Sequence, residues 1–150
     1  MSRLQWTADL DTGIEVIDSQ HRSIVDYINR LHDAVEKRNR EEIASVFDEL
    51  VDYTATHFSF EEGLQEQAGY PYRAAHQRVH QVFIKKLDEH KRRFEQGDMS
   101  VAYQLIDMLR NWLVGHIKND DADYVESVRK VIDSGENNGW ISRSLKRLFG

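Results

Sequence analysis

Four long stretches of the chain carry apolar residues at every third or fourth position, which is the spacing of an amphipathic α-helix. They cover about residues 19–35, 40–67, 71–94 and 100–132. One proline and no cysteine in 150 residues favour long helices and exclude disulfide scaffolds and Cys-ligated metals. The short connections predict an all-α fold, an antiparallel up-down-up-down four-helix bundle.

Residues at the ends of these stretches predict where the helices begin and end. Asp18 or Ser19 is expected to cap the first helix, Gly69 to end the second, and Pro71 to lie in the first turn of the third. We expect one bundle domain over residues 1–133, including an N-terminal arm at 1–18. A linker and a short amphipathic basic helix are expected over residues 134–150.

Charge is uneven along the chain. The net charge of −6 disfavours non-specific nucleic-acid binding, although the segment 139–150 is basic. Its apolar stripe predicts either a helix folded back on the bundle or a docking surface for a protein partner or an anionic membrane. No segment approaches the roughly 18 apolar residues of a membrane span, and the first ten residues lack a signal-like apolar core. A cytoplasmic protein, with a monomer favoured, is the expectation.

Polar side chains lie on the inward stripes of all four expected helices. Burial of unpaired polar groups is costly, and burial of an isolated carboxylate is costlier still. A set shared by four helices therefore predicts a common partner, and metal ions suit it because they neutralise carboxylates and use imidazole lone pairs. The expected metal ligands are His21, His57, Glu61, His76, His80, His116 and Asp121.

The number and kind of these donors favour two metal ions. Five imidazoles and two carboxylates are too many for one tetrahedral site, and imidazole with carboxylate suits iron among the abundant metals. His116 and Asp121 are five residues apart, which in a regular α-helix separates the side chains by about 140°. We therefore expect them to flank an extended centre, with Asp121 reaching over to bridge.

The combined motifs resemble the hemerythrin family, in particular its single-domain bacterial members, over about residues 1–132. They are G-I-x-x-I-D-x-Q-H ending at His21, H-F-x-x-E-E from His57, H-x-x-x-H from His76, and W-L-x-x-H-I-x-x-x-D-x-x-Y from Trp112. The resemblance implies two iron ions per chain joined by an oxo or hydroxo bridge.

The resemblance also implies a role for each ligand. His76, His80 and His116 would hold one iron, His21 and His57 the other, and the two carboxylates would bridge both. The iron with two histidines would keep an open position for dioxygen. The family's apolar lining maps onto Ile24, Phe58, Trp112, Leu113 and Ile117. A dry pocket slows the access of water and protons, so bound oxygen leaves intact.

The function that follows is reversible dioxygen binding for transport, storage or local delivery, with no catalytic residue. One alternative is an oxygen or nitric oxide sensor, with the tail as its output. Another is a di-iron oxidase or peroxidase, although ferritin-like enzymes use Glu-x-x-His pairs and no histidine here has Glu three residues before it. His32 and His90 are expected at the surface or its boundary and not as ligands.

Overall fold

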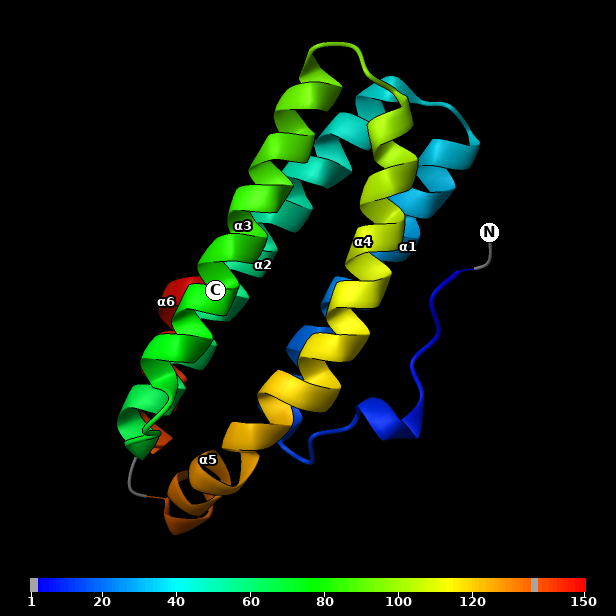
Figure 1. The fold of residues 1–150 in the computed structure, drawn as a ribbon. Helices are drawn as coiled ribbons and strands as arrows, with labels where there is room; N and C mark the ends of the chain where they lie inside the picture. The colour runs from blue at the N-terminus through cyan, green and yellow to red at the C-terminus, as the bar shows by residue number, and fades with distance from the viewer. Residues whose placement is uncertain (1–2, 136–137) are drawn as a thin grey trace.

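The computed structural model describes residues 3–135 and 138–150, and within those ranges it contains helices and turns but no strand. The predicted all-α four-helix bundle is confirmed (Figure 1). Its elements are η1 (Ala8–Leu10), α1 (Glu15–Glu36), α2 (Arg40–Ala68), α3 (Arg73–Glu95), α4 (Ser100–Gly115), the π-helical turn η2 (His116–Asp121), α5 (Ala122–Ser134) and α6 (Asn138–Phe149).

The four long helices form the bundle by packing in a closed square. Helices α1 and α3 each pack against both α2 and α4. Helix α5 continues the chain beyond α4 but packs against α2, diagonally opposite α4 (Figure 1). The π-helical turn that joins α4 to α5 therefore carries the chain inward across the bundle. In the part of the chain described, no helix is both long and apolar enough to span a bilayer.

The α1–α2 and α3–α4 turns lie at the same end of the bundle (Figure 1), and the apolar stripes fill the interior there. Leu31, Leu50, Leu87 and Leu105, one from each helix, are all 0% exposed. Val79 of α3 is 41% exposed. The adjacent His80 takes the inward position, because the two neighbours on a helix cannot face the same direction.

Helix ends differ from the expectations in two places. Helix α1 begins at Glu15, before the expected caps. Asp18 lies inside the helix, where its buried carboxylate accepts hydrogen bonds from the backbone N–H groups of Thr12 and Gly13 and so fixes the arm. Helix α3 begins at Arg73, so Pro71 lies in the preceding turn. Gly69 ends α2 as expected, in the left-handed conformation that glycine adopts without strain.

The last expected helix is divided by η2, a turn with a wider backbone repeat than the α-helix. The sequence pattern predicted one regular helix from about residue 100 to 132, so this part of the prediction was wrong. Turns of this type add residues to a helical turn and often occur at functional sites. The interruption changes which side chains of the segment share a face.

Both ends of the chain lie against the bundle. Leu10, Ile14 and Ile17 are buried, and Leu4 and Trp6 pack at its edge. Helix α6 folds back on α2, as one of the two tail alternatives predicts. Its Trp140 ring stacks on Phe60 at a centroid distance of 5.9 Å. A Cβ atom at Gly63 would lie 2.8 Å from that ring, so the close approach depends on glycine.

Candidate metal centre

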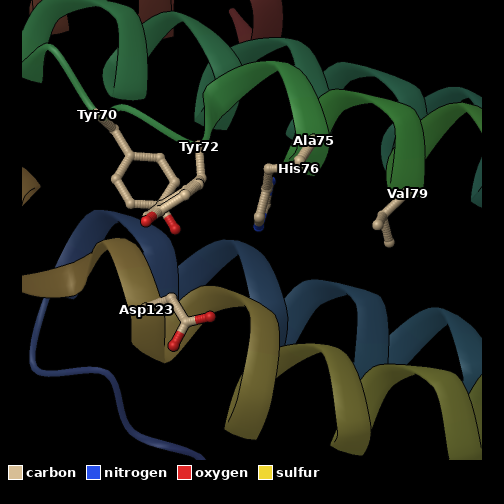
Figure 2. Close-up of a pocket in the computed structure, with 6 residues that line it drawn as sticks. All are labelled: Tyr70, Tyr72, Ala75, His76, Val79 and Asp123. Atoms are coloured by element: carbon tan, nitrogen blue, oxygen red, sulfur yellow. The ribbon is translucent and has the colours of Figure 1, made fainter.

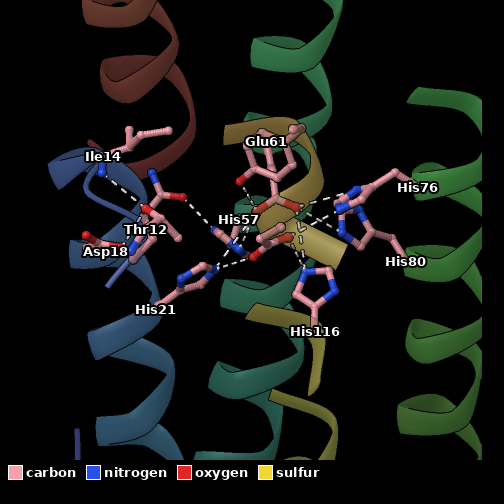
Figure 3. Close-up of polar contacts among 12 residues, drawn as sticks. Thr12, Ile14, Asp18, His21, His57, Glu61, His76, His80 and His116 are labelled. Carbon is pink, nitrogen blue, oxygen red and sulfur yellow. Dashed lines mark hydrogen bonds and ion pairs between the residues drawn. The ribbon is translucent and has the colours of Figure 1, made fainter. Parts of the chain in front are cut away.

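Seven polar side chains meet inside the bundle near its α2–α3 end (Figure 3). Each is at most 6% exposed. They come from all four sides of the bundle, and they are His21 of α1, His57 and Glu61 of α2, His76 and His80 of α3, and His116 and Asp121 of η2. The structure therefore brings together every residue that the sequence predicted as a metal ligand.

Glu61 lies between two groups of histidines. Its Oε1 atom is 3.1 Å from Nε2 of His80 and 3.6 Å from Nε2 of His116. Its Oε2 atom faces the other way, 3.3 Å from Nε2 of His57 and 4.0 Å from Nε2 of His21. Each oxygen of the Glu61 carboxylate thus faces a different group of histidines.

Asp121 divides its two oxygens in the same way. Its Oδ1 atom lies 2.9 Å from Nε2 of His116 and 3.2 Å from Nε2 of His76. Its Oδ2 atom lies 3.0 Å from Nε2 of His21 on the opposite side. The angle of about 140° between His116 and Asp121 holds for a regular α-helix, but the two residues lie in a π-helical turn, whose wider repeat brings their side chains into contact.

The donor atoms fall into two sets that could each hold a cation. Glu61, His76, His80 and His116 form one set, and His21, His57 and Glu61 form the other. Within each set the donor atoms lie within 4.8 Å of one another. Because Glu61 belongs to both sets and Asp121 touches both, the arrangement suits two neighbouring cations that share carboxylates.

Several buried nitrogens in the centre lack a hydrogen bond. They include Nε2 of His21, His57 and His80, although each lies near a carboxylate oxygen. Buried polar atoms nearly always find a partner. A cation at each histidine set would satisfy these lone pairs, so the donors fit the metal ions that the sequence implied.

Both carboxylates are held as anions. Burial by itself raises the pKa of Glu61, but His57, His116 and His80 outweigh it, so its pKa lies well below the usual value. Burial and the charge of Glu61 raise the pKa of Asp121, but His116 and His21 lower it by more, so its pKa also lies below the usual value. Two negative charges in a dry core attract cations strongly, since little water screens them.

The histidines respond to burial and to their neighbours in opposite ways. Burial lowers the pKa of His57, which favours the neutral ring that a metal requires. Burial also lowers the pKa of His80, but the nearby carboxylates of Glu61 and Glu62 outweigh burial and raise the pKa. A cation between His80 and Glu61 would take over the position of that proton.

A second layer of polar side chains orients the donors. Nδ1 of His57 lies 2.6 Å from Oε1 of Gln20, and Nδ1 of His76 lies 3.1 Å from the side-chain amide of Gln65. Tyr124 donates a 2.9 Å hydrogen bond to Oε2 of Glu61, and burial raises the pKa of its phenol well above the usual value. Oε1 of Gln20 accepts the Nδ1 proton of His57 and so leaves the Nε2 lone pair of that ring directed at the centre.

Sequence reasoning did not assign these supporting roles. Gln65 could have been found, because it lies four residues after Glu61 and so shares its inward face. The roles of Gln20 and Tyr124 depend on contacts between helices, for which the local pattern carries no signal.

The five expected pocket residues all belong to or contact the buried apolar core. The Phe58 ring stacks on His80 at 3.7 Å between centroids, and Trp112 stacks on His116 at 4.5 Å. Phe58 also lies 5.8 Å from the ring of His57. Ile24, Leu113 and Ile117 are buried beside them. The two aromatic rings thus cover the three-histidine set more closely than the two-histidine set.

Two further histidines lie outside the centre. His32 is 5% exposed, so the expectation of a surface position was wrong; it contacts Asp33 and Glu36 on its own helix. His90 is half-buried on α3, with Nδ1 2.7 Å from the carbonyl oxygen of Lys86.

The comparisons with known proteins agree with one another. The family model described as a hemerythrin HHE cation binding domain matches residues 12–128. A bacteriohemerythrin from Pseudomonas aeruginosa (strain LESB58) is 47% identical over an alignment of 154 positions, which covers 100% of both chains. One from Methylococcus capsulatus is 34% identical over 125 residues, 83% of this chain and 95% of that protein.

Solved structures show the same likeness in three dimensions. A wild-type hemerythrin crystal structure is 31% identical and superposes with a TM-score of 0.76, covering 85% of this chain and 98% of that one. From the match to the family model, the close relatives and the shared fold, we conclude that this chain belongs to the hemerythrin family.

Proposed function

We propose that this protein binds dioxygen reversibly at a pair of iron ions held by the seven buried donors. The observation that carries the proposal is the division of Glu61 and Asp121, each of which presents one oxygen to each histidine set. This is the arrangement that two bridged cations require. The relatives named bacteriohemerythrin support the same function.

The two histidine sets are unequal, and we propose that this inequality provides the binding position. His76, His80 and His116 would hold one iron, whereas only His21 and His57 would hold the other. A pair of iron ions, when bound, supplies the electrons that reversible oxygen binding uses. The ion that only His21 and His57 would hold would keep a position free for dioxygen.

The chain's own residues would protect that chemistry. Ile24, Leu113 and Ile117 are buried apolar side chains with no proton to give, and Phe58 and Trp112 cover the imidazoles of α3 and η2. Tyr124, Gln20 and Gln65 hold the donors in place. A dry, fixed site limits the access of water and protons, which favours release of oxygen over irreversible oxidation.

We propose a binding protein and not an enzyme. The centre described here has two carboxylates and five imidazoles, whereas ferritin-like di-iron enzymes use more carboxylates. We also propose residues 1–133 as the oxygen-binding unit and 134–150 as an added helix. The match of the family model to residues 12–128 and the position of α6 outside the bundle support that division.

Cycles of anaerobic reduction and oxygenation, followed by visible absorption, test the function. We expect two irons per chain and a charge-transfer band that appears with oxygen and disappears when oxygen is removed. Steady consumption of a reductant with oxygen or peroxide, faster than the loss of the oxygenated band, would support an oxidase or peroxidase instead.

A pair of variants on one helix tests the ligand assignment. His76→Ala removes a proposed donor and should lower the iron content sharply. His90→Ala removes a histidine of the same helix that lies outside the centre, and it should leave the content unchanged. Full iron content in His76→Ala would contradict the assignment.

A further inference from the structure

A cavity of about 320 Å³ lies between α3 and α5, against the outer side of the centre. Its lining residues are Tyr70, Tyr72, Ala75, His76, Val79 and Asp123. Figure 2 shows them facing a common space between the two helices, with the ring of His76 reaching into it. The volume is near the lower end of ligand cavities, which span about 300–1,000 Å³, so a small molecule would fit.

The cavity touches the centre through His76. One edge of this imidazole lines the cavity, while its Nε2 atom lies 3.2 Å from Oδ1 of Asp121. A molecule in the cavity would therefore be separated from the proposed irons by one imidazole ring. Tyr70 gives a second connection, because its ring lies 6.1 Å from that of Tyr124, which hydrogen-bonds Glu61.

We propose that this cavity binds a small aromatic one-electron donor of the hydroquinone class, which returns the oxidised centre to its oxygen-binding state. The proposal depends on the proposed function, since it requires iron at His76. An oxygen-binding di-iron protein needs such a donor, because each irreversible oxidation leaves ferric ions that no longer take up oxygen.

The lining suits an aromatic donor without negative charge. Tyr70 and Tyr72 are 5.9 Å apart at 72°, so they offer ring faces in two orientations for an aromatic guest. Ala75 and Val79 provide an apolar wall. Asp123 is an exposed carboxylate at the cavity, which repels anionic donors and can accept a hydrogen bond from a phenolic hydroxyl.

The electrons and protons balance without any further reactant. A hydroquinone gives up two electrons and two protons in one-electron steps and leaves as a quinone. The ring of His76 would carry the electrons toward the centre, where two bound ferric ions would become ferrous. The protons pass to water at the open side of the cavity.

A second cavity of equal volume provides a matched comparison. It lies between α2 and α3 and includes Ala55, Phe58 and His80. There the Phe58 ring covers the His80 imidazole in a stack of 3.7 Å, and the rim carries charges of both signs. His80 also lines this cavity, but Phe58 covers one face of its imidazole. Ala55 and Ala75 are both exposed helical alanines, one in each cavity.

The test compares Ala75→Trp with Ala55→Trp in the full-length, iron-loaded protein. Stopped-flow absorption measures reduction of the oxidised protein by reduced menadione, a neutral hydroquinone, and by dithionite as a small anionic control. Calorimetry measures menadione binding independently of the iron chemistry. Ala75→Trp should weaken menadione binding and slow reduction by menadione by about tenfold or more, with an unchanged dithionite rate and oxygenated spectrum.

Ala55→Trp should match the wild-type protein in all of these measurements. Unchanged menadione binding and reduction in Ala75→Trp, or equal slowing in both variants, would overturn the proposal. If the wild-type protein failed to bind oxygen reversibly, that result would contradict the proposed function. Menadione binding that Ala75→Trp abolishes would still support the cavity in that case.

Discussion

The two ends of one bundle bury different kinds of side chain. The α1–α2 and α3–α4 turns lie together at one end (Figure 1), and the interior there is apolar, with Leu31, Leu50, Leu87 and Leu105 wholly buried. Toward the α2–α3 turn the chain buries five imidazoles and two carboxylates beside a second, smaller apolar cluster that includes Phe60 and Leu64. The apolar end is stable through removal of its surface from water. The polar end requires cations, because buried charge without a counter-ion is costly.

Removal of iron should produce the largest difference in stability between the two ends of the bundle. Loss of the partner of a buried charge costs about 3–5 kcal/mol, and that cost falls on the polar end. Hydrogen exchange with and without a chelator should therefore show faster exchange in η2 and α5 while the amides around Leu31 and Leu87 stay protected. Equal loss of protection at both ends would show that the bundle responds as one unit.

A cavity in the apolar end should have the complementary effect. Leu87→Ala removes a wholly buried side chain and should lower the free energy of unfolding by about 2–5 kcal/mol. Iron content should remain complete, and the loss measured by chemical denaturation should be the same before and after chelation. A loss that depends on iron would mean that the ends are coupled.

The hydrogen bond from Tyr124 tests the support of the polar end. Tyr124→Phe keeps the ring but removes the donor to Glu61, and a hydrogen bond to a charged group contributes about 1.5–3 kcal/mol. We expect the free energy of unfolding of Tyr124→Phe to fall by about that amount, and we expect the variant to release iron to a chelator faster than the wild type does. Tyr103→Phe, at a residue that is 49% exposed in the apolar end, is the control and should change neither quantity.

Variants at the contact between α6 and α2 should change the free energy of unfolding least. Replacement of glycine by alanine inside a helix stabilises by about 1 kcal/mol. In Gly63→Ala the new methyl group would displace Trp140 and offset that gain. In a Trp140→Ala background the gain in the free energy of unfolding should reappear. Chemical denaturation of the wild type, the two single variants and the double variant should therefore give a coupling free energy of about 1 kcal/mol. Additive changes in the free energy of unfolding would show that Trp140 of α6 does not pack against Gly63.

Much of this fold could be predicted from local pattern alone. The apolar periodicity indicated all four bundle helices, and Gly69 correctly marked the end of α2. The stripe positions of His57, Glu61, His76 and His80 pointed inward for the same reason, since residues four apart share a helical face. The burial of His32 was missed, because it depends on a neighbouring helix and not on its own stripe.

The sequence by itself determined which stripes of the four bundle helices would face inward and what chemistry their side chains could support, because helical periodicity and donor type are properties of the chain. Only the tertiary structure decided how Glu61 and Asp121 divide their oxygens between the two histidine sets. That division depends on the π-helical turn, which turns Asp121 toward His116 and carries α5 across to α2, where Tyr124 meets Glu61. The turn forms where packing between helices outweighs the regular α-helical repeat, and no local pattern records that balance.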